Sequence, residues 1–176
     1  MGLGKTLQII SLLIDAKKNG RLKKALIVCP ASLVYNWSEE ISKFDTENIL
    51  TVSVLAAGKE ERQKILEEHD GVDIYISSYD TLRRDISLYH DMKFSHQIID
   101  EAQFIKNQNT GVAKAVKALK ADVKFALTGT PIENRLSELW SIFDYIMPGF
   151  LYSYNSFRSK YENGIVKDGD KDSAKL

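Results

Sequence analysis

The sequence has little of several features that mark particular classes of protein. Its single cysteine, Cys29, excludes an internal disulfide and any metal site built from several cysteines. No apolar run approaches the roughly 20 residues that cross a bilayer, so we expect no membrane span. Lys plus Arg and Asp plus Glu both number 24, so neither sign of charge is in excess. A polyanionic partner would therefore have to be held by local contacts rather than by an overall basic field.

What is present is the composition and length of one ordinary globular domain, with 44% hydrophobic and 27% charged residues. Short β-branched runs alternate with longer stretches of helical periodicity. This alternation predicts an α/β fold, a mainly parallel sheet with helices on both faces. We expect strands at 25–29, 50–55, 73–77, 95–100 and 124–127, and helices at 6–18, 33–44, 60–69, 81–89, 112–120 and 136–147.

The first residues match the second half of a P-loop, the phosphate-binding turn known as Walker A. Glycines let backbone N–H groups curl around phosphates, and the following helix adds its positive dipole. Lys5 would reach the β- and γ-phosphates of ATP, and Thr6 would be a ligand of Mg²⁺. The phosphate-binding segment consists of Gly2, Leu3, Gly4, Lys5 and Thr6. The alternative interpretation of these residues is a flexible glycine-rich segment before a helix.

Two adjacent carboxylates, Asp100 and Glu101, follow the apolar run that ends at Ile99. Successive side chains of a strand point in different directions, so the two carboxylates can serve different roles. Asp100 would face Mg²⁺, and Glu101 would orient or deprotonate the attacking water. The alternative, a pair of solvated acids in a turn, is disfavoured by the apolar strand and by the upstream Gly4-Lys5-Thr6.

Five ordered motifs together give a more specific reading. The chain resembles the SWI/SNF-like, DNA-dependent ATPases of helicase superfamily two, and the resemblance covers nearly its whole length. The motifs are the segment 1–8, the segment 27–33 with Trp37 after it, the segment 77–79, the acidic segment Asp100-Glu101-Ala102-Gln103, and the segment 128–140 that begins Thr128-Gly129-Thr130-Pro131. Many family members have His where this chain has Gln103, which is a neutral donor and acceptor.

This resemblance implies a RecA-like P-loop NTPase lobe and assigns further site residues. Gln103 is expected on the γ-phosphate side of the nucleotide. Three other segments are implied to contact the DNA backbone or to couple it to the nucleotide. For Ser77 and Ser78 an N-cap remains an equal alternative, and for Thr128 to Thr130 a tight strand-to-helix turn. The implied DNA-binding or coupling residues are Pro30, Ala31, Ser32, Ser77, Ser78, Tyr79, Thr128, Gly129, Thr130 and Asn134.

The resemblance further implies a protein that hydrolyses ATP with Mg²⁺, moves along double-stranded DNA and remodels protein–DNA complexes. Residues 1–150 would be its first ATP-binding lobe, cut within Walker A, and 151–176 a connector or the start of a helical insertion. A second RecA-like lobe in the same protein would supply arginines, so we expect this piece alone to be inactive. The location would be the bacterial cytoplasm, at the nucleoid, or the eukaryotic nucleus.

Two alternatives to this function stay open at this point. One is a strand-separating helicase or restriction-type translocase of the same superfamily. The other is a non-catalytic interaction module. Trp37 and Trp140 also have two readings, as stacking platforms or as core residues, and their helical spacing with apolar neighbours favours the core.

Overall fold

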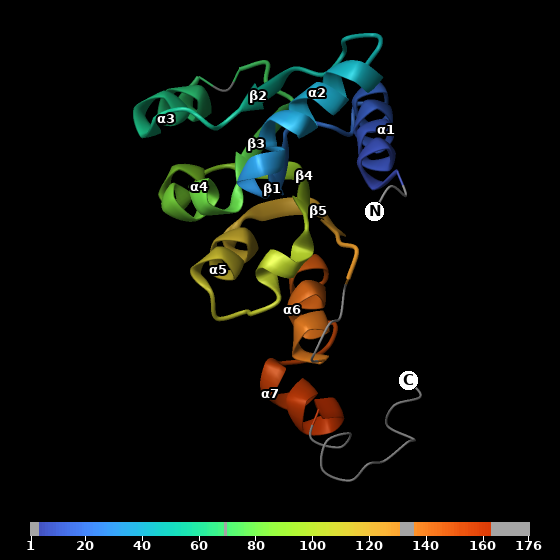
Figure 1. The fold of residues 1–176 in the computed structure, drawn as a ribbon, viewed down its shortest axis with the longest axis vertical. Helices are drawn as coiled ribbons and strands as arrows, with labels where there is room; N and C mark the ends of the chain where they lie inside the picture. The colour runs from blue at the N-terminus through green and yellow to red at the C-terminus, as the bar shows by residue number, and fades with distance from the viewer. Residues whose placement is uncertain (1–3, 69, 131–135, 163–176) are drawn as a thin grey trace.

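The computed structural model describes residues 4–68, 70–130 and 136–162. Its centre is a five-stranded sheet with the strand order β2-β3-β1-β4-β5, in which every neighbouring pair is parallel (Figure 1). This confirms the predicted parallel α/β fold. The strands are β1 (Ala25–Cys29), β2 (Val52–Val54), β3 (Ile74–Ser78), β4 (Lys93–Asp100) and β5 (Lys120–Leu127).

Helices cover both faces of this sheet, as the alternating pattern predicted. Residues of α1 and α2 are buried in one core, and residues of α3, α4, α5 and α6 are buried in the other. Near the C-terminus the short helix α7 and a π-helical turn at Arg158–Glu162 pack against α6. The helices are α1 (Lys5–Lys18), α2 (Val34–Phe44), α3 (Lys59–Glu67), α4 (Tyr79–Arg84), α5 (Gly111–Ala118), α6 (Leu136–Ile146) and α7 (Tyr154–Phe157).

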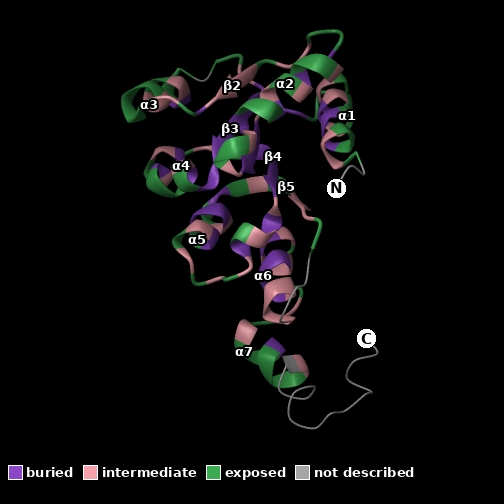
Figure 2. Ribbon diagram, in the orientation of Figure 1, coloured by how far each residue is buried: buried purple, intermediate pink, exposed green. Residues whose placement is uncertain are grey.

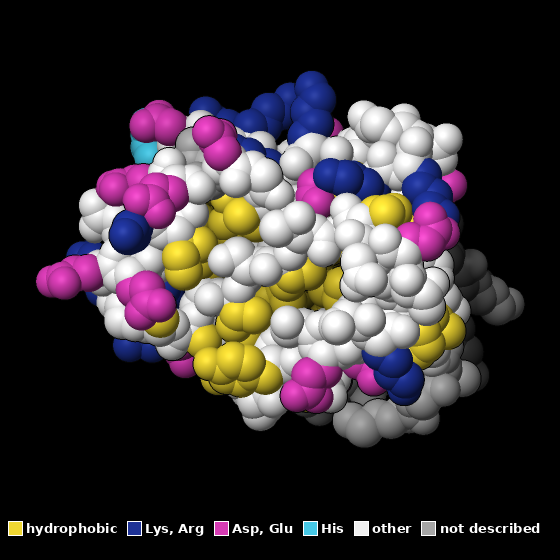
Figure 3. Space-filling model, turned by 90° about the horizontal axis from the view of Figure 1, so that it is seen from above, with side chains coloured by type: hydrophobic (Ala, Val, Ile, Leu, Met, Phe, Trp, Pro, Cys, Tyr) yellow, Lys and Arg dark blue, Asp and Glu magenta, His cyan; other side chains and the backbone are white. Residues whose placement is uncertain are grey.

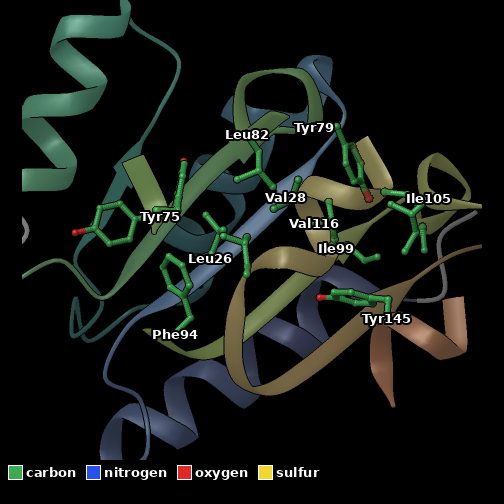
Figure 4. Packing of buried hydrophobic residues seen from close by; sticks show 14 of the residues in the cluster. Leu26, Val28, Tyr75, Tyr79, Leu82, Phe94, Ile99, Ile105, Val116 and Tyr145 are labelled. Atoms are coloured by element: carbon green, nitrogen blue, oxygen red, sulfur yellow. The ribbon is translucent and has the colours of Figure 1, made fainter. Parts of the chain in front are cut away.

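The central strand β1 shows how one sequence serves two cores. All five of its residues are buried (Figure 2). Leu26 and Val28 pack in the core beneath α4 and α5, where Figure 4 shows them beside Tyr75 and Ile99. Ala25, Ile27 and Cys29 belong to the opposite core, with α1 and α2. Side chains on a strand alternate between faces, so a strand covered on both sides must be apolar throughout.

The predicted boundaries differ from the structure by one or two residues at several elements and by more at two places, each of these for a tertiary reason. The helix expected at 81–89 is broken at Asp85 into α4 and a 3-10 turn (Ile86–Tyr89). There the buried Asp85 carboxylate binds Arg62 of α3 at 2.6 Å. The helix expected at 112–120 ends at Ala118, because Lys120 already pairs with Lys93 of β4. For the same reason β5 begins four residues earlier than predicted.

The surface carries no broad region of a single charge on the face seen in Figure 3. Acidic and basic side chains are interspersed around its rim, and hydrophobic side chains lie along its middle. Among the described residues no helix is long and apolar enough to cross a membrane. The parallel strands bring their carboxyl ends to one edge of the sheet, where ligands of such folds bind.

Candidate active site

The phosphate-binding segment lies at the start of α1. Gly4 precedes the helix in the left-handed conformation, with φ 69° and ψ 21°, which favours glycine. Gly4 provides no side-chain cap, and the first turn of α1 has no acidic residue, so the positive end of the helix dipole is not neutralised locally. Lys5 and Thr6 are half-buried in that first turn. Gly2 and Leu3 lie outside the described residues.

The carboxylate of Asp100 is buried at the end of β4 and held on both oxygens. The indole N–H of Trp37 donates to Oδ2 at 3.0 Å, and the backbone N–H of Glu101 donates to Oδ1 at 2.9 Å. Burial raises the pKa of Asp100, while these two hydrogen bonds and the positive charge of Lys5 act to lower it. The start of α1 is thus close enough for the charge of Lys5 to act on this carboxylate.

Glu101 differs from Asp100 in its backbone conformation. It has a left-handed conformation, with φ 54° and ψ 58°, at the start of the 3-10 turn Ala102–Ile105. This conformation is unfavourable for a residue with a Cβ and is typical of functional turns. Glu101 is half-buried, whereas Asp100 is only 9% exposed. The two carboxylates therefore occupy different environments, as their different predicted roles require.

A chain of hydrogen bonds joins Glu101 to the segment after β5. The amide of Gln103 donates to Glu101 Oε2 at 2.6 Å. The hydroxyl of Thr128 donates to Gln103 Oε1 at 3.3 Å, and the backbone N–H of Thr130 donates to that hydroxyl at 3.1 Å. Gln103 thus acts as both donor and acceptor. It places Thr128, a predicted coupling residue, one side chain away from the predicted catalytic carboxylate.

The residues at this edge of the sheet suit a magnesium ion, which needs few protein ligands, better than a metal ion coordinated entirely by protein side chains. No group of three or more His, Cys, Asp or Glu in the described part of the chain has metal-site geometry. Mg²⁺ commonly takes one or two protein ligands and completes its shell with water and substrate phosphates. Asp100 and Thr6 would hold it here, and the bound ion would neutralise charge on the transferred phosphoryl group.

The first predicted DNA segment is accessible. It follows β1, and Ala31 and Ser32 are exposed in the 3-10 turn Ala31–Leu33, which leads without a gap into α2. Pro30 is half-buried with extended backbone angles. Hydroxyls and backbone amides at such a turn suit contacts to phosphate that carry no sequence information. The DNA contact itself stays a prediction.

The second predicted DNA segment follows β3, and its side chains serve the fold more than the surface. Ser78 is the N-cap of α4, because its hydroxyl accepts from the backbone N–H of Thr81 at 3.1 Å. This confirms the N-cap interpretation for Ser78. Ser77 is fully buried and Tyr79 is 3% exposed, so their side chains do not reach the surface. Any DNA contact here would use Ser78 or the backbone.

The third segment lies after β5. Gly129 and Thr130 are exposed and Thr128 is half-buried at the carboxyl edge. Asn134, the last predicted coupling residue, lies outside the described residues. The structure therefore brings Lys5, Asp100, Gln103 and Thr128 to one edge of the sheet, as the motifs predicted.

Trp37 is a site residue that the sequence reading missed. The prediction of a core position is confirmed for both tryptophans, since Trp37 is 1% and Trp140 is 6% exposed. Each buried indole N–H has a partner, as buried indoles require. Trp140 donates to the carbonyl of Tyr152 at 3.2 Å, but Trp37 donates to Asp100. The need for such a partner was the available signal, although spacing alone could not identify it.

Comparison with known proteins shows the family of the chain. A family model described as SNF2-related domain matches residues 1–176. An uncharacterized ATP-dependent helicase of Mycoplasma pneumoniae is 42% identical over 163 residues, which are 92% of this chain and 16% of that protein. Human TATA-binding protein-associated factor 172 is 37% identical over 182 residues, which cover 97% of this chain and 10% of that protein.

A solved structure gives the same assignment. The Sulfolobus solfataricus SWI2/SNF2 ATPase core in complex with double-stranded DNA is 44% identical, with a TM-score of 0.86 over 98% of this chain and 35% of that chain. The chain thus spans only a small part of its curated relatives and about a third of the solved core. It belongs to the SNF2-related family and has the RecA-like fold of the N-terminal lobe of the SWI2/SNF2 ATPase core.

Proposed function

We propose that this chain is the first ATP-binding lobe of a DNA-dependent ATPase that translocates on duplex DNA and remodels protein–DNA complexes. The observation that carries the proposal is the hydrogen-bonded chain from Glu101 through Gln103 to Thr128 and Thr130. It connects the residue expected to activate water with the segment expected to couple DNA to the nucleotide. A simple nucleotide-binding module has no need of that connection.

The catalytic roles follow from position and charge. Lys5 and the amides at the start of α1 would bind the phosphates of ATP. Thr6 and Asp100 would hold Mg²⁺, and Glu101 would orient the attacking water and accept its proton. Arginines of a second RecA-like lobe in the same protein would stabilise the remaining negative charge on the γ-phosphate in the transition state.

The DNA substrate is supported by two observations. One solved relative is described as an ATPase core in complex with double-stranded DNA. In this chain Ala31 and Ser32 provide an exposed turn for phosphate contacts at the carboxyl end of β1. Such contacts would be independent of base sequence.

The test uses the full-length native protein. ATP hydrolysis should be stimulated by duplexes of unrelated sequence, and the protein should displace a third strand from a triplex without separating the duplex. Separation of the duplex itself would favour the strand-separating helicase. Failure to bind Mg-ATP would favour the interaction module, and stimulation by RNA alone would refute the duplex assignment.

A further inference from the structure

Trp37 connects an exposed turn to the buried carboxylate of Asp100. The turn Ala31–Leu33 continues directly into α2, and Trp37 lies in the first turn of that helix. Its indole N–H donates to Asp100 Oδ2 at 3.0 Å in a fully buried contact. A helical backbone is stiff over this length, so displacement of Ser32 would be passed to the indole.

Tyr79 makes a second connection to the same residue. It is the first residue of α4, directly after the cap Ser78. Its hydroxyl donates to the backbone carbonyl of Asp100 at 2.7 Å. Its ring also stacks on Phe104, with centroids 4.9 Å apart and the ring planes within 3° of parallel. Phe104 lies in the 3-10 turn that follows Glu101.

Asp100 is therefore held at three atoms, two of them by residues from other parts of the chain. Trp37 holds one carboxylate oxygen, the N–H of Glu101 binds the other, and Tyr79 holds the backbone carbonyl. Packing alone would be satisfied by a phenylalanine at either aromatic position. The polar atoms of both side chains are directed specifically to the residue that begins the catalytic turn.

We propose that Trp37 and Tyr79 are positioning residues, through which duplex DNA bound at the segments 30–32 and 77–79 sets the orientation of Asp100 and of the turn at Glu101. This proposal rests on the proposed function, since it requires DNA to engage the two segments. Both side chains are buried and so have almost no surface to offer to DNA. Each acts through Asp100.

The variants are Trp37→Phe and Tyr79→Phe, each of which removes one donor and keeps an aromatic ring. Matched controls are Trp140→Phe and Tyr145→Phe. Trp140 loses a hydrogen bond to the carbonyl of Tyr152, and Tyr145 loses one to the carbonyl of Gln97 in β4, so neither control loses a bond to Asp100. All four positions are buried, so the controls match the loss of a buried donor.

The first measurement is the ratio of duplex-stimulated to basal ATP hydrolysis in the full-length protein. Trp37→Phe should lower this ratio by about tenfold, the size of one hydrogen bond to a charged group, and Tyr79→Phe by about threefold, the size of a neutral one. The controls should keep the wild-type ratio. Affinity for duplex DNA should change by less than about twofold in every variant, because no DNA contact is removed.

The second measurement needs neither nucleotide nor metal. Amide hydrogen exchange is followed in the peptide containing Glu101, whose N–H binds Asp100 Oδ1. In EDTA, duplex DNA should change exchange of this peptide in the wild type and in both controls, but not in Trp37→Phe or Tyr79→Phe. A purely structural role would alter the exchange with and without DNA equally.

Two results separate the proposals. If duplex DNA fails to stimulate the wild type, both the proposed function and this inference are overturned. If the wild type is stimulated and both variants keep the full ratio and the full DNA-dependent change in exchange, this inference alone is overturned. If Trp37→Phe does not fold, Tyr79→Phe decides the matter alone, because it loses a single oxygen atom.

Discussion

The hydrogen-bonded chain between Glu101 and Thr128 gives the sharpest quantitative prediction. In Thr128→Val a methyl group replaces the hydroxyl, so the bond of 3.3 Å to Gln103 is lost with little change in shape. A neutral hydrogen bond contributes about 0.5–1.5 kcal/mol, and this one is long and half-exposed, so we take about 0.5–1 kcal/mol. The catalytic constant for duplex-stimulated hydrolysis should fall about two- to fivefold.

Gln103→Ala should have a larger effect, because Gln103 donates directly to the Glu101 carboxylate at 2.6 Å. Bonds to charged groups contribute about 1.5–3 kcal/mol, and partial exposure places this one near the lower value, or about tenfold in rate. ATP affinity should stay close to that of the wild type if Gln103 acts mainly on Glu101. Thr46→Val, at an exposed position, is the control and should leave both quantities unchanged.

The double variant decides whether the residues act in series. If Thr128 reaches Glu101 only through Gln103, Thr128→Val should cost nothing further once Gln103 is alanine, and the double variant should remain about tenfold slower. Steady-state hydrolysis at saturating ATP and duplex DNA measures all four rates. Multiplication of the two single effects would refute the connection.

Three further predictions concern the fold and the phosphate turn. Arg62→Ala should lower the free energy of unfolding by about 3 kcal/mol, because Asp85, 3% exposed, would lose its charged partner; a urea titration showing less than about 1 kcal/mol would contradict this. Gly4→Ala should weaken ATP binding about five- to thirtyfold through a left-handed backbone cost of about 1–2 kcal/mol, whereas Gly58→Ala, at φ −60°, should not; calorimetric titration of both tests it. Burial raises the pKa of Cys29 to about 12, so its thiol should resist alkylation at pH 8 until urea unfolds the chain, and rapid labelling of the native protein would refute the burial. The contribution of Cys29 to the free energy of unfolding should fall as the pH rises from about 9 towards 12, because the thiol ionises first in the unfolded chain.

Much of the fold could be predicted because its local signals agree with its tertiary structure. Residues 25–29 form a continuous apolar run, and the strand β1 has those bounds. The break at Asp85 could not be predicted in this way. It depends on Arg62, which is 23 residues away and belongs to a different helix. Without that partner the segment has the periodicity of a continuous helix.

The site shows the same division between local and tertiary information. Residue types and order were enough to predict Lys5, Asp100 and Glu101 as site residues, because phosphate and metal chemistry restricts the residue types strongly. The left-handed backbone of Glu101 was not predictable, since glutamate rarely adopts it. The bond from Trp37 to Asp100 joins residues 63 positions apart. Only the folded sheet brings the two together.

Glu101 is the residue that we propose activates the water that attacks ATP. The decisive measurement is duplex-stimulated ATP hydrolysis by Glu101→Gln in the full-length protein, with Mg-ATP binding measured in parallel and Glu60→Gln as the exposed control. Loss of a general base lowers rates by roughly 10²–10⁴-fold, so hydrolysis should fall at least a hundredfold. Binding should be retained, because Lys5, Thr6 and Asp100 are unchanged. Hydrolysis within a few fold of the wild-type rate would contradict the account.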